Sequence, residues 1–226
     1  MKSKTANLRK RKHILIVDDH PMMRQGLAQL INSEPDLLVC READTARQAF
    51  EFVRQEQPDL AIVDISLPDK SGLELIKDMH ALYPDLLMLV VSMHDESLYA
   101  ERVLRAGARG YLMKQEGGKK LMEAIRQVLG GQIAVSEKIA ARILEIFSGS
   151  GRDPGGSPIG RLSDREFEVF QLIGHGRGTR EIAAHLRLSV KTVEVHRANI
   201  KAKLDLRSAT DLVRSAVRWI ESQPPS

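Results

Sequence analysis

Between residues 13 and 130, short apolar runs alternate with amphipathic segments, and this alternation most constrains how the chain folds. Short runs rich in Ile, Val and Leu are typical of buried parallel strands, whereas apolar residues spaced three or four apart indicate helices. Strands are expected at 13–17, 37–41, 60–64, 86–91 and 110–112, and helices at 21–31, 46–55, 71–82, 97–106 and 119–129. Because parallel strands need crossover connections, these five pairs predict an α/β domain with a doubly wound, five-stranded parallel sheet.

The remainder of the chain has helical spacing alone, with short helices expected at 164–174, 180–186, 190–204 and 209–221. Ser163 and Glu166 have the spacing of a capping box. One helix is expected at 136–147, and the segment 148–158, rich in Gly, Ser and Pro, is typical of a flexible linker. The chain is therefore divided into a basic tail (1–12), an α/β domain (13–130), a linker with one helix (131–160) and a small all-α domain (161–226).

Charge differs between these parts. Residues 1–12 contain six basic and no acidic side chains, residues 13–130 have a net charge of −6, and residues 161–226 have a net charge of +4. The tail is expected to be disordered and solvated. An acidic domain joined to a basic one indicates separate partners, of which the second is expected to be nucleic acid.

Composition places the chain among ordinary globular proteins, with 42% hydrophobic and 28% charged residues. The apolar run 86–91 is too short to cross a bilayer, and the lysines at the start are not followed by a signal-peptide core, so no membrane partner is expected. Cys40 is the single cysteine and forms no intramolecular disulfide. A cytoplasmic location is the simplest expectation.

Carboxylates follow two of the expected strands. Asp18 and Asp19 come directly after the run 13–17, and Asp64 ends the run 60–64. Because the carboxyl ends of parallel strands meet at one edge of the sheet, these three side chains are expected to converge. Like charges that close repel one another, and a hard divalent cation with oxygen ligands relieves the repulsion. The sequence therefore predicts a Mg²⁺ site.

Two further groups belong to the same edge, because Ser92 follows the fourth strand and Lys114 follows the fifth. Phosphoryl transfer requires a metal, a nucleophile and donors for the equatorial oxygens. A carboxylate serves as such a nucleophile, and Asp64 on the central strand is best placed for that role. Each residue taken singly is more often a cap, a turn residue or a solvated side chain, so the prediction depends on their conjunction.

The segments that meet at this edge resemble the receiver domain of two-component response regulators over residues 13 to about 130. The resemblance is carried by Val17-Asp18-Asp19-His20, by Asp64 with Pro68 and Gly72, by Val91-Ser92, and by Gly110-Tyr111-Leu112-Met113-Lys114. It implies that Asp64 accepts a phosphoryl group from a sensor histidine kinase and that the receiver is a switch and not a multi-turnover enzyme.

The resemblance also implies a role for each neighbouring residue. Mg²⁺ would be bound by Asp19, Asp64 and the backbone carbonyl of Ser66, while Asp18 would assist through a metal-bound water. The phosphoryl oxygens would be contacted by Ser92 and Lys114, and Tyr111 matches the family's switch aromatic. The chain departs from the family at one position, and two further residues occupy positions that vary within the family. Gln115 stands where a proline often follows the lysine, and Ser66 and His94 occupy positions that influence the lifetime of the acyl phosphate in this family.

The helix expected at 190–204 has two faces on a helical wheel. Its inward face would carry Val193, His196, Ile200 and Leu204, and its outward face Lys191, Val195, Ala198 and Ala202, with Glu194 beside them. Small residues between polar flanks suit the major groove of DNA. Base contacts are expected from Lys191, Glu194 and Val195, and phosphate contacts from Arg197, Lys201 and Lys203. A solvated basic helix is the alternative, but the preceding helix and the turn at 187–189 favour a helix-turn-helix.

The pattern of this region resembles the LuxR-type helix-turn-helix. It is carried by Leu162-Ser163-x-Arg165-Glu166, Glu181-Ile182-Ala183, Leu188-Ser189-x-Lys191-Thr192-Val193-Glu194-x-His196 and Lys203-Leu204. With the receiver, the whole chain is similar to response regulators of the NarL/FixJ type. The resemblance implies binding of double-stranded DNA as a homodimer, with Arg180 near the DNA backbone. On the helical wheel, Thr192 flanks the outward face and Ala198 permits close approach, so both are expected near the DNA. Dimer contacts would come from the helix at 209–221, through Leu212, Val213, Ala216 and Val217, which are equally expected to seal the module's own core.

Together these features predict a DNA-binding transcription regulator controlled by phosphorylation of Asp64. Two other classes compete with this prediction. A metal-dependent phosphatase with an aspartyl nucleophile would need an acid–base carboxylate two residues after Asp64, where Ser66 stands. A receiver coupled to an RNA-binding antiterminator would need a different output module, and a preference for single-stranded RNA would distinguish it.

Overall fold

The computed structural model describes residues 11–147 and 158–222. The chain divides into two compact units, Met1–Ile139 and Ala140–Ser226, and each is described by itself. Nearly all of the expected basic tail (1–12) and of the glycine-rich segment 148–158 lies outside the described residues. Among the residues that are described, no helix is both long enough and apolar enough to cross a membrane.

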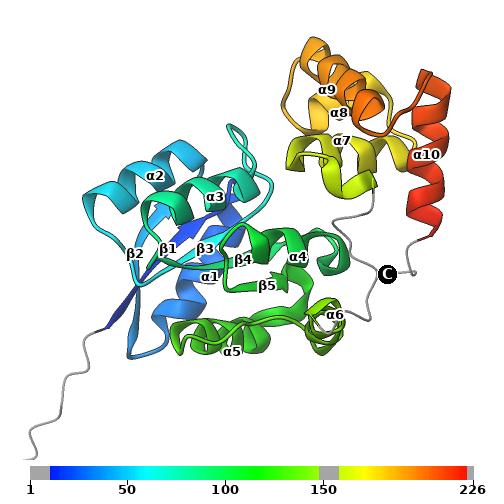
Figure 1. Cartoon of the computed structure of the whole chain (residues 1–226). Helices are drawn as coiled ribbons and strands as arrows, with labels where there is room; N and C mark the ends of the chain where they lie inside the picture. The colour runs from blue at the N-terminus through cyan, green and yellow to red at the C-terminus, as the bar shows by residue number, and fades with distance from the viewer. Residues whose placement is uncertain (1–10, 148–157, 223–226) are drawn as a thin grey trace, which may run out of the picture. The chain divides into compact units, whose positions relative to one another are not determined.

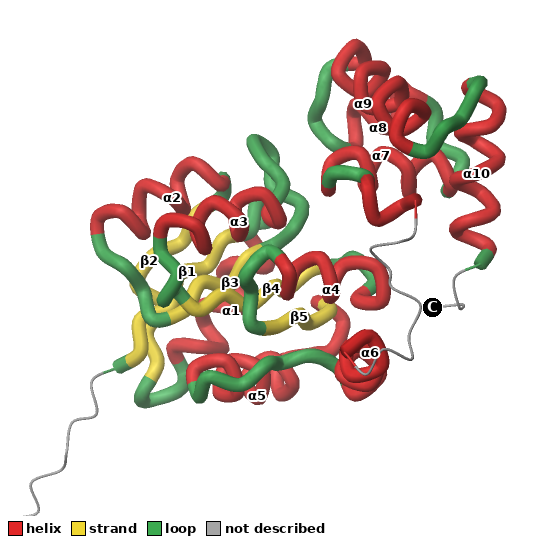
Figure 2. The backbone as a smooth tube through the Cα atoms, viewed as in Figure 1, coloured by secondary structure: helices red, strands yellow, loops and turns green. Residues whose placement is uncertain are grey.

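The predicted five-stranded parallel sheet is confirmed, and Figure 2 shows its strands side by side. The sheet order is β2-β1-β3-β4-β5, and the strands are β1 (Lys12–Val17), β2 (Leu37–Ala43), β3 (Leu60–Val63), β4 (Leu87–Ser92) and β5 (Gly110–Met113). All four residues of β3 are buried, because this central strand is covered on both faces. Asp64, expected as the last residue of β3, directly follows it, while Ser92 is the last residue of β4.

Helices cover both faces of the sheet (Figure 1). On one face lie α1 (Pro21–Asn32) and α5 (Gly117–Leu129), and on the other α2 (Ala46–Gln55), α3 (Gly72–Leu82) and α4 (Glu96–Arg105). The expected helices are all present; α2 has the expected bounds, and the other four differ at one or both ends. For example, α4 begins one residue early because Asp95 caps it, accepting a hydrogen bond from Ser97 N at 2.7 Å.

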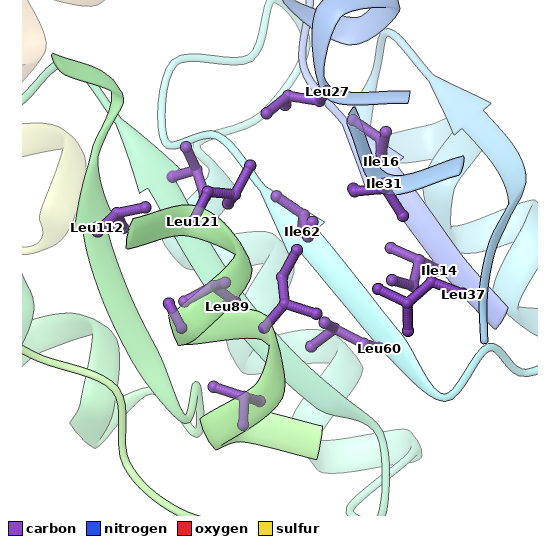
Figure 3. Packing of buried hydrophobic residues seen from close by; sticks show 14 of the residues in the cluster. Ile14, Ile16, Leu27, Ile31, Leu37, Leu60, Ile62, Leu89, Leu112 and Leu121 are labelled. Atoms are coloured by element: carbon purple, nitrogen blue, oxygen red, sulfur yellow. The ribbon is translucent and has the colours of Figure 1, made fainter. Parts of the chain in front are cut away.

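The main core of this unit lies between the sheet and the α1/α5 layer (Figure 3). Ile14 and Ile16 of β1, with Ile62 of β3, present their side chains to Ile31 of α1 and Ile125 of α5. Each of these five side chains is almost completely shielded from solvent. The alternate residues of the strands face the opposite helix layer, so the sheet is fixed between two layers of helices. Because the strands are parallel, their carboxyl ends, and the polar residues that follow them, lie at one edge.

The residues after α5 continue the sheet unit before the chain leaves it. Ala134 bridges to Gly110 of β5 in parallel, donating from its N to Arg109 O at 2.9 Å and accepting from Tyr111 N at 2.8 Å. The helix α6 (Glu137–Phe147) then begins close to the expected position. Residues 131–139, which the sequence had placed in the linker, thus belong to the first compact unit.

The second unit is helical, with α7 (Asp164–Gly174), α8 (Thr179–His185), α9 (Val190–Lys203) and α10 (Ala209–Glu221) after a short 3-10 turn (Pro158–Arg161). The predicted capping box of α7 is present, and Ser189 and Ser208 cap α9 and α10. The expected start of α8 is corrected: Gly178 stands at the N-cap and Thr179 is the first helical residue, because the Glu181 side chain accepts from Gly178 N at 2.7 Å.

The core of the second unit is built on aromatic packing between α7 and α10. Trp219 of α10 lies 5.4 Å from the ring of Phe167 and 5.9 Å from the ring of Phe170. Gly174, at the end of α7, permits a close approach, because a Cβ there would stand 2.7 Å from Ala216 O. From α9, Val193 and Ile200 complete this core. One face of α9 is therefore committed to packing and the other is left to solvent.

Candidate functional site

Three carboxylates converge at the carboxyl edge of the sheet, as the strand pattern predicted. Asp18 follows β1 and Asp64 follows β3, and these two residues are 2% and 3% exposed. Together with Asp19 and His20, they offer ligand atoms that all lie within 4.8 Å of one another. This group, with Lys114, is called the acidic site below. Its close-set oxygens form a suitable ligand set for a divalent cation.

Lys114 enters the acidic site from the end of β5. Its Nζ lies 2.7 Å from Asp64 Oδ2 and 2.7 Å from Asp18 Oδ2, and its side chain is as deeply buried as theirs. Burial alone would lower the pKa of Lys114, but the two carboxylates outweigh it and hold that pKa above its ordinary value. For Asp64 burial prevails, so its pKa is raised although Lys114 opposes the shift. One ammonium thus only partly neutralises the buried carboxylates.

The carboxylate oxygen of Asp64 that does not contact Lys114, Oδ1, is available to a cation or an electrophile. Asp64 Oδ1 is buried and accepts no hydrogen bond from the described residues. A buried carboxylate oxygen without a donor carries a desolvation cost that a cation or an electrophile would relieve. The backbone around Asp64 is held tightly, because a Cβ on Gly72 would stand 2.0 Å from Asp64 O. Gly72 is therefore required where α3 begins against this loop.

The exposed face of α9 forms the second candidate site. Lys191, Glu194, Val195 and Ala198 are all exposed, and Val195 presents 52% of its surface although it is apolar. Thr192, Arg197 and Lys201 flank this face and are half-buried, while Arg180 is exposed on α8. An apolar residue among cationic side chains, on a helix whose opposite face packs through Val193 and Ile200, is suited to the major groove of a duplex. The helical-wheel prediction is thus confirmed for Val193 and Ile200, whereas His196 and Leu204 are only half-buried.

Family models match both units. The response regulator receiver domain matches residues 14–126, and the luxR family of bacterial regulatory proteins matches residues 160–216. The chain is 36% identical over 209 residues to the oxygen regulatory protein NreC of Staphylococcus carnosus, and this covers 91% of the chain and 96% of that protein. This chain is a LuxR-family response regulator. Another relative, NreC of Staphylococcus haemolyticus, is 35% identical over the same length.

Solved structures agree with the assignment of this response regulator. A LuxR-family response regulator from Aurantimonas sp. SI85-9A1 is 33% identical, with a TM-score of 0.57, and covers 62% of the chain and 99% of its own. RcsB of Salmonella enterica serovar Typhimurium, bound to promoter rprA in the presence of the phosphomimetic BeF3-, is 26% identical with a TM-score of 0.59. That match covers 92% of this chain and 99% of RcsB.

Ser92 and Tyr111, for which the sequence resemblance predicts roles in switching, lie on β4 and β5 next to the acidic site. Ser92 is completely buried at the end of β4, and its Oγ lies 3.5 Å from His94 N. The ring of Tyr111 is turned inward, and its hydroxyl donates to His94 O at 2.7 Å. Burial raises the pKa of this phenol, so Tyr111 stays neutral throughout the physiological range. A displacement of the loop 93–95 would remove the carbonyl that holds Tyr111 in place.

Two contacts in this response regulator were not expected from the sequence. The hydroxyl of Ser66 and His94 Nε2 are 3.0 Å apart, which joins the loop after β3 to the loop after β4. His20, which appeared in the sequence only as part of the receiver-like motif, lies with its Nδ1 2.8 Å from Asp19 Oδ1 and 3.2 Å from Asp18 Oδ1. The available signal was its position directly after two strand-end carboxylates.

The remaining predicted residues are placed in different surroundings. Lys203 is exposed, but its ammonium is paired across the helices, because its Nζ is 2.6 Å from Glu166 Oε2 of α7. Of the four α10 residues expected to contact a second subunit, Leu212 and Ala216 are completely buried in the module's own core. Val213 is 40% exposed and Val217 is half-buried, so only this pair remains available on the surface of the described unit.

Proposed function

We propose that this response regulator is a DNA-binding transcription regulator switched by phosphorylation of Asp64. The observation that carries the proposal is the acidic site itself, in which a buried carboxylate oxygen without a donor stands beside a buried lysine. A single chain contains both this site and an exposed, cationic α9 face. Such a combination couples a chemical input to an output that depends on charge.

Mg²⁺ is the proposed resident cation, bound by Asp19, Asp64 and the Ser66 backbone carbonyl, with Asp18 acting through a water. When bound, it would supply charge neutralisation for the phosphoryl oxygens. The oxygen-rich donor set supports this choice, because hard divalent cations prefer carboxylate and carbonyl ligands. No other metal is needed to explain these ligands.

The chain's own residues divide the work of accepting the phosphoryl group from a sensor histidine kinase. Asp64 would attack the phosphorus through a carboxylate oxygen, forming an acyl phosphate while the donor histidine leaves. Lys114, already held against Asp64 at 2.7 Å, would pair with a phosphoryl oxygen, and Ser92 would donate its hydroxyl to another. Drawing Ser92 toward that oxygen would reposition the loop that accepts the Tyr111 hydroxyl at His94 O.

A small phosphodonor such as acetyl phosphate, given with Mg²⁺, tests the acceptor residue. Intact-mass measurement should show one added phosphoryl group on the wild type and on Asp59→Ala, which removes a carboxylate at the opposite end of β3. Asp64→Ala should remain unmodified. Equal modification of Asp64→Ala and the wild type would refute the assignment, and rapid turnover of a free phosphate ester would support a phosphatase instead.

The second half of the proposal is that α9 enters the major groove of duplex DNA. Lys191, Glu194 and Val195 would contact base edges, and Ala198 would permit close approach. The backbone phosphates would be contacted by Thr192, Arg197, Lys201 and Arg180. A homodimer would place two such helices on paired half-sites. Salt-dependent binding to a duplex is the expected result, whereas preference for single-stranded RNA would contradict this output.

A further inference from the structure

The last turn of α9 is anchored to the first turn of α7 by an ion pair. Lys203 Nζ lies 2.6 Å from Glu166 Oε2, with 40% of the lysine side chain but only 5% of the glutamate side chain exposed. Removing Lys203 from this pair would leave Glu166 buried without its cation, which is costly. The ammonium of Lys203 is therefore retained by the protein and is not readily given to a phosphate.

Glu166 is also held in place by Ser163, independently of Lys203. Its Oε2 accepts from Ser163 N at 2.8 Å, and its own N donates to Ser163 Oγ at 3.4 Å, forming the capping box of α7. Burial would raise the pKa of Glu166, but Lys203 and Ser163 more than offset it and the pKa is lowered. Glu166 is thus an ionised, immobilised anchor at neutral pH.

The neighbouring residue, Arg165, makes a second anchor on the other helix. Its Nη2 donates to Leu186 O, the C-cap carbonyl of α8, at 3.1 Å, while its Nη1 donates to Glu168 Oε2 at 2.7 Å. Two successive residues of α7 therefore contact the carboxyl ends of the two helices that form the helix-turn-helix.

Both of these helix ends have the same backbone form. Arg187 after α8 has a φ of 52°, and Asp205 after α9 has a φ of 54°. Leu188 N then donates to Ala183 O at 2.8 Å, and Leu206 N to Lys201 O at 2.9 Å. These are Schellman motifs, which end each helix sharply. Each anchor from α7 thus meets a helix end whose position is well defined.

We propose that Arg165 and Glu166 act as positioning residues, forming a two-point clamp that sets the angle between α8 and α9. Lys203 belongs to this clamp and does not contact DNA. The clamp would matter for binding because side chains that read base edges require the helix to enter the groove at one depth and inclination. This inference rests on the proposed DNA binding by α9.

The salt dependence of binding separates a clamp residue from a phosphate contact. Full-length variants would be titrated against a fluorescent duplex, selected from a random pool by the wild type, at several salt concentrations. Each phosphate contact contributes about 0.9 to the slope of log affinity against log salt. Lys201→Met should therefore lower the slope by about 1. Lys203→Met and Arg165→Met should weaken binding several-fold while leaving the slope unchanged.

Rescue and coupling complete the test. Lys203→Arg retains the pair with Glu166 and should restore wild-type affinity, and Lys203→Met combined with Glu166→Gln should bind no worse than Lys203→Met alone. Circular dichroism confirms that each variant is folded at the titration temperature. A slope lowered by Lys203→Met as much as by Lys201→Met, or unchanged affinity in the clamp variants, would overturn the inference. If the wild type itself shows no salt-dependent binding, the proposed DNA binding fails instead.

Discussion

The acidic site and the α9 face are both charged, but they hold their charges in opposite ways. In the acidic site the side chains of Asp18, Asp64 and Lys114 are buried and neutralise one another incompletely. On the α9 face, the charged side chains of Lys191, Arg197 and Lys201 are exposed or half-buried, so water already solvates them. Buried charges that are incompletely neutralised carry a free-energy cost, which a bound cation or phosphoryl group can relieve. An exposed cationic face instead gains binding affinity chiefly by releasing counterions from its partner. Removing one charge should therefore be severe in the first region and mild in the second.

The largest effect is expected when the buried ammonium is removed. Lys114→Met would leave Asp18 and Asp64 facing each other and should lower the free energy of unfolding at pH 7 by about 3 kcal/mol, measured in urea without divalent cations. Because burial raises the pKa of Asp64, its carboxylate takes up a proton at a higher pH than in the unfolded chain. The loss should therefore shrink as the pH falls through the acidic range. An undiminished loss at low pH would contradict the electrostatic explanation.

Divalent cations provide the next test of the repulsion between the carboxylates of the acidic site. Mg²⁺ at a hundred times its dissociation constant should stabilise the wild type by about 2.7 kcal/mol, because it binds only the folded chain. Thermal unfolding with and without EDTA measures this gain. Asp19→Asn should lose most of it, and Asp59→Asn, at the opposite edge of the sheet, should keep it. Equal gains in both variants would place the cation elsewhere.

Substitutions on α9 should have smaller effects, and those effects should differ in kind. Arg197→Met should weaken binding at every duplex sequence and lower the salt slope by about 1, whereas Val195→Ser should change sequence preference by about 1–3 kcal/mol with the slope unaltered. Affinity measured on a panel of single-base variants of the selected duplex distinguishes the two. Unfolding free energies should stay close to that of the wild type, in contrast to Lys114→Met.

The smallest effect is expected in the turn after α9. Asp205 has a positive φ that glycine adopts without strain, so Asp205→Gly should stabilise the second unit by about 0.5 kcal/mol. Chemical denaturation followed by Trp219 fluorescence reports on this unit. A destabilised variant would show that the Asp205 side chain contributes more than the backbone strain costs.

Strand-end chemistry was predictable from local pattern, but side-chain partnerships were not. Asp18, Asp64 and Lys114 converge as expected because a parallel sheet necessarily brings its carboxyl ends together. Lys203 shows the opposite case. On a helical wheel it belongs with the DNA-facing cations, yet its ammonium is drawn to Glu166. A wheel describes one isolated helix and contains no information about the neighbour packed across it.

The sequence by itself determined the five strands, the convergence of carboxylates at one edge and the exposed face of α9. These follow from periodicity, from the short range of strand and helix geometry, and from the fixed direction of parallel strands. Tertiary structure alone decided that Ser66 meets His94, that Ala134 extends along β5, and that Arg165 and Glu166 hold the ends of α8 and α9. The physical reason is that these contacts join residues distant in sequence, and long polar side chains take whichever partner the packing of the elements brings within reach.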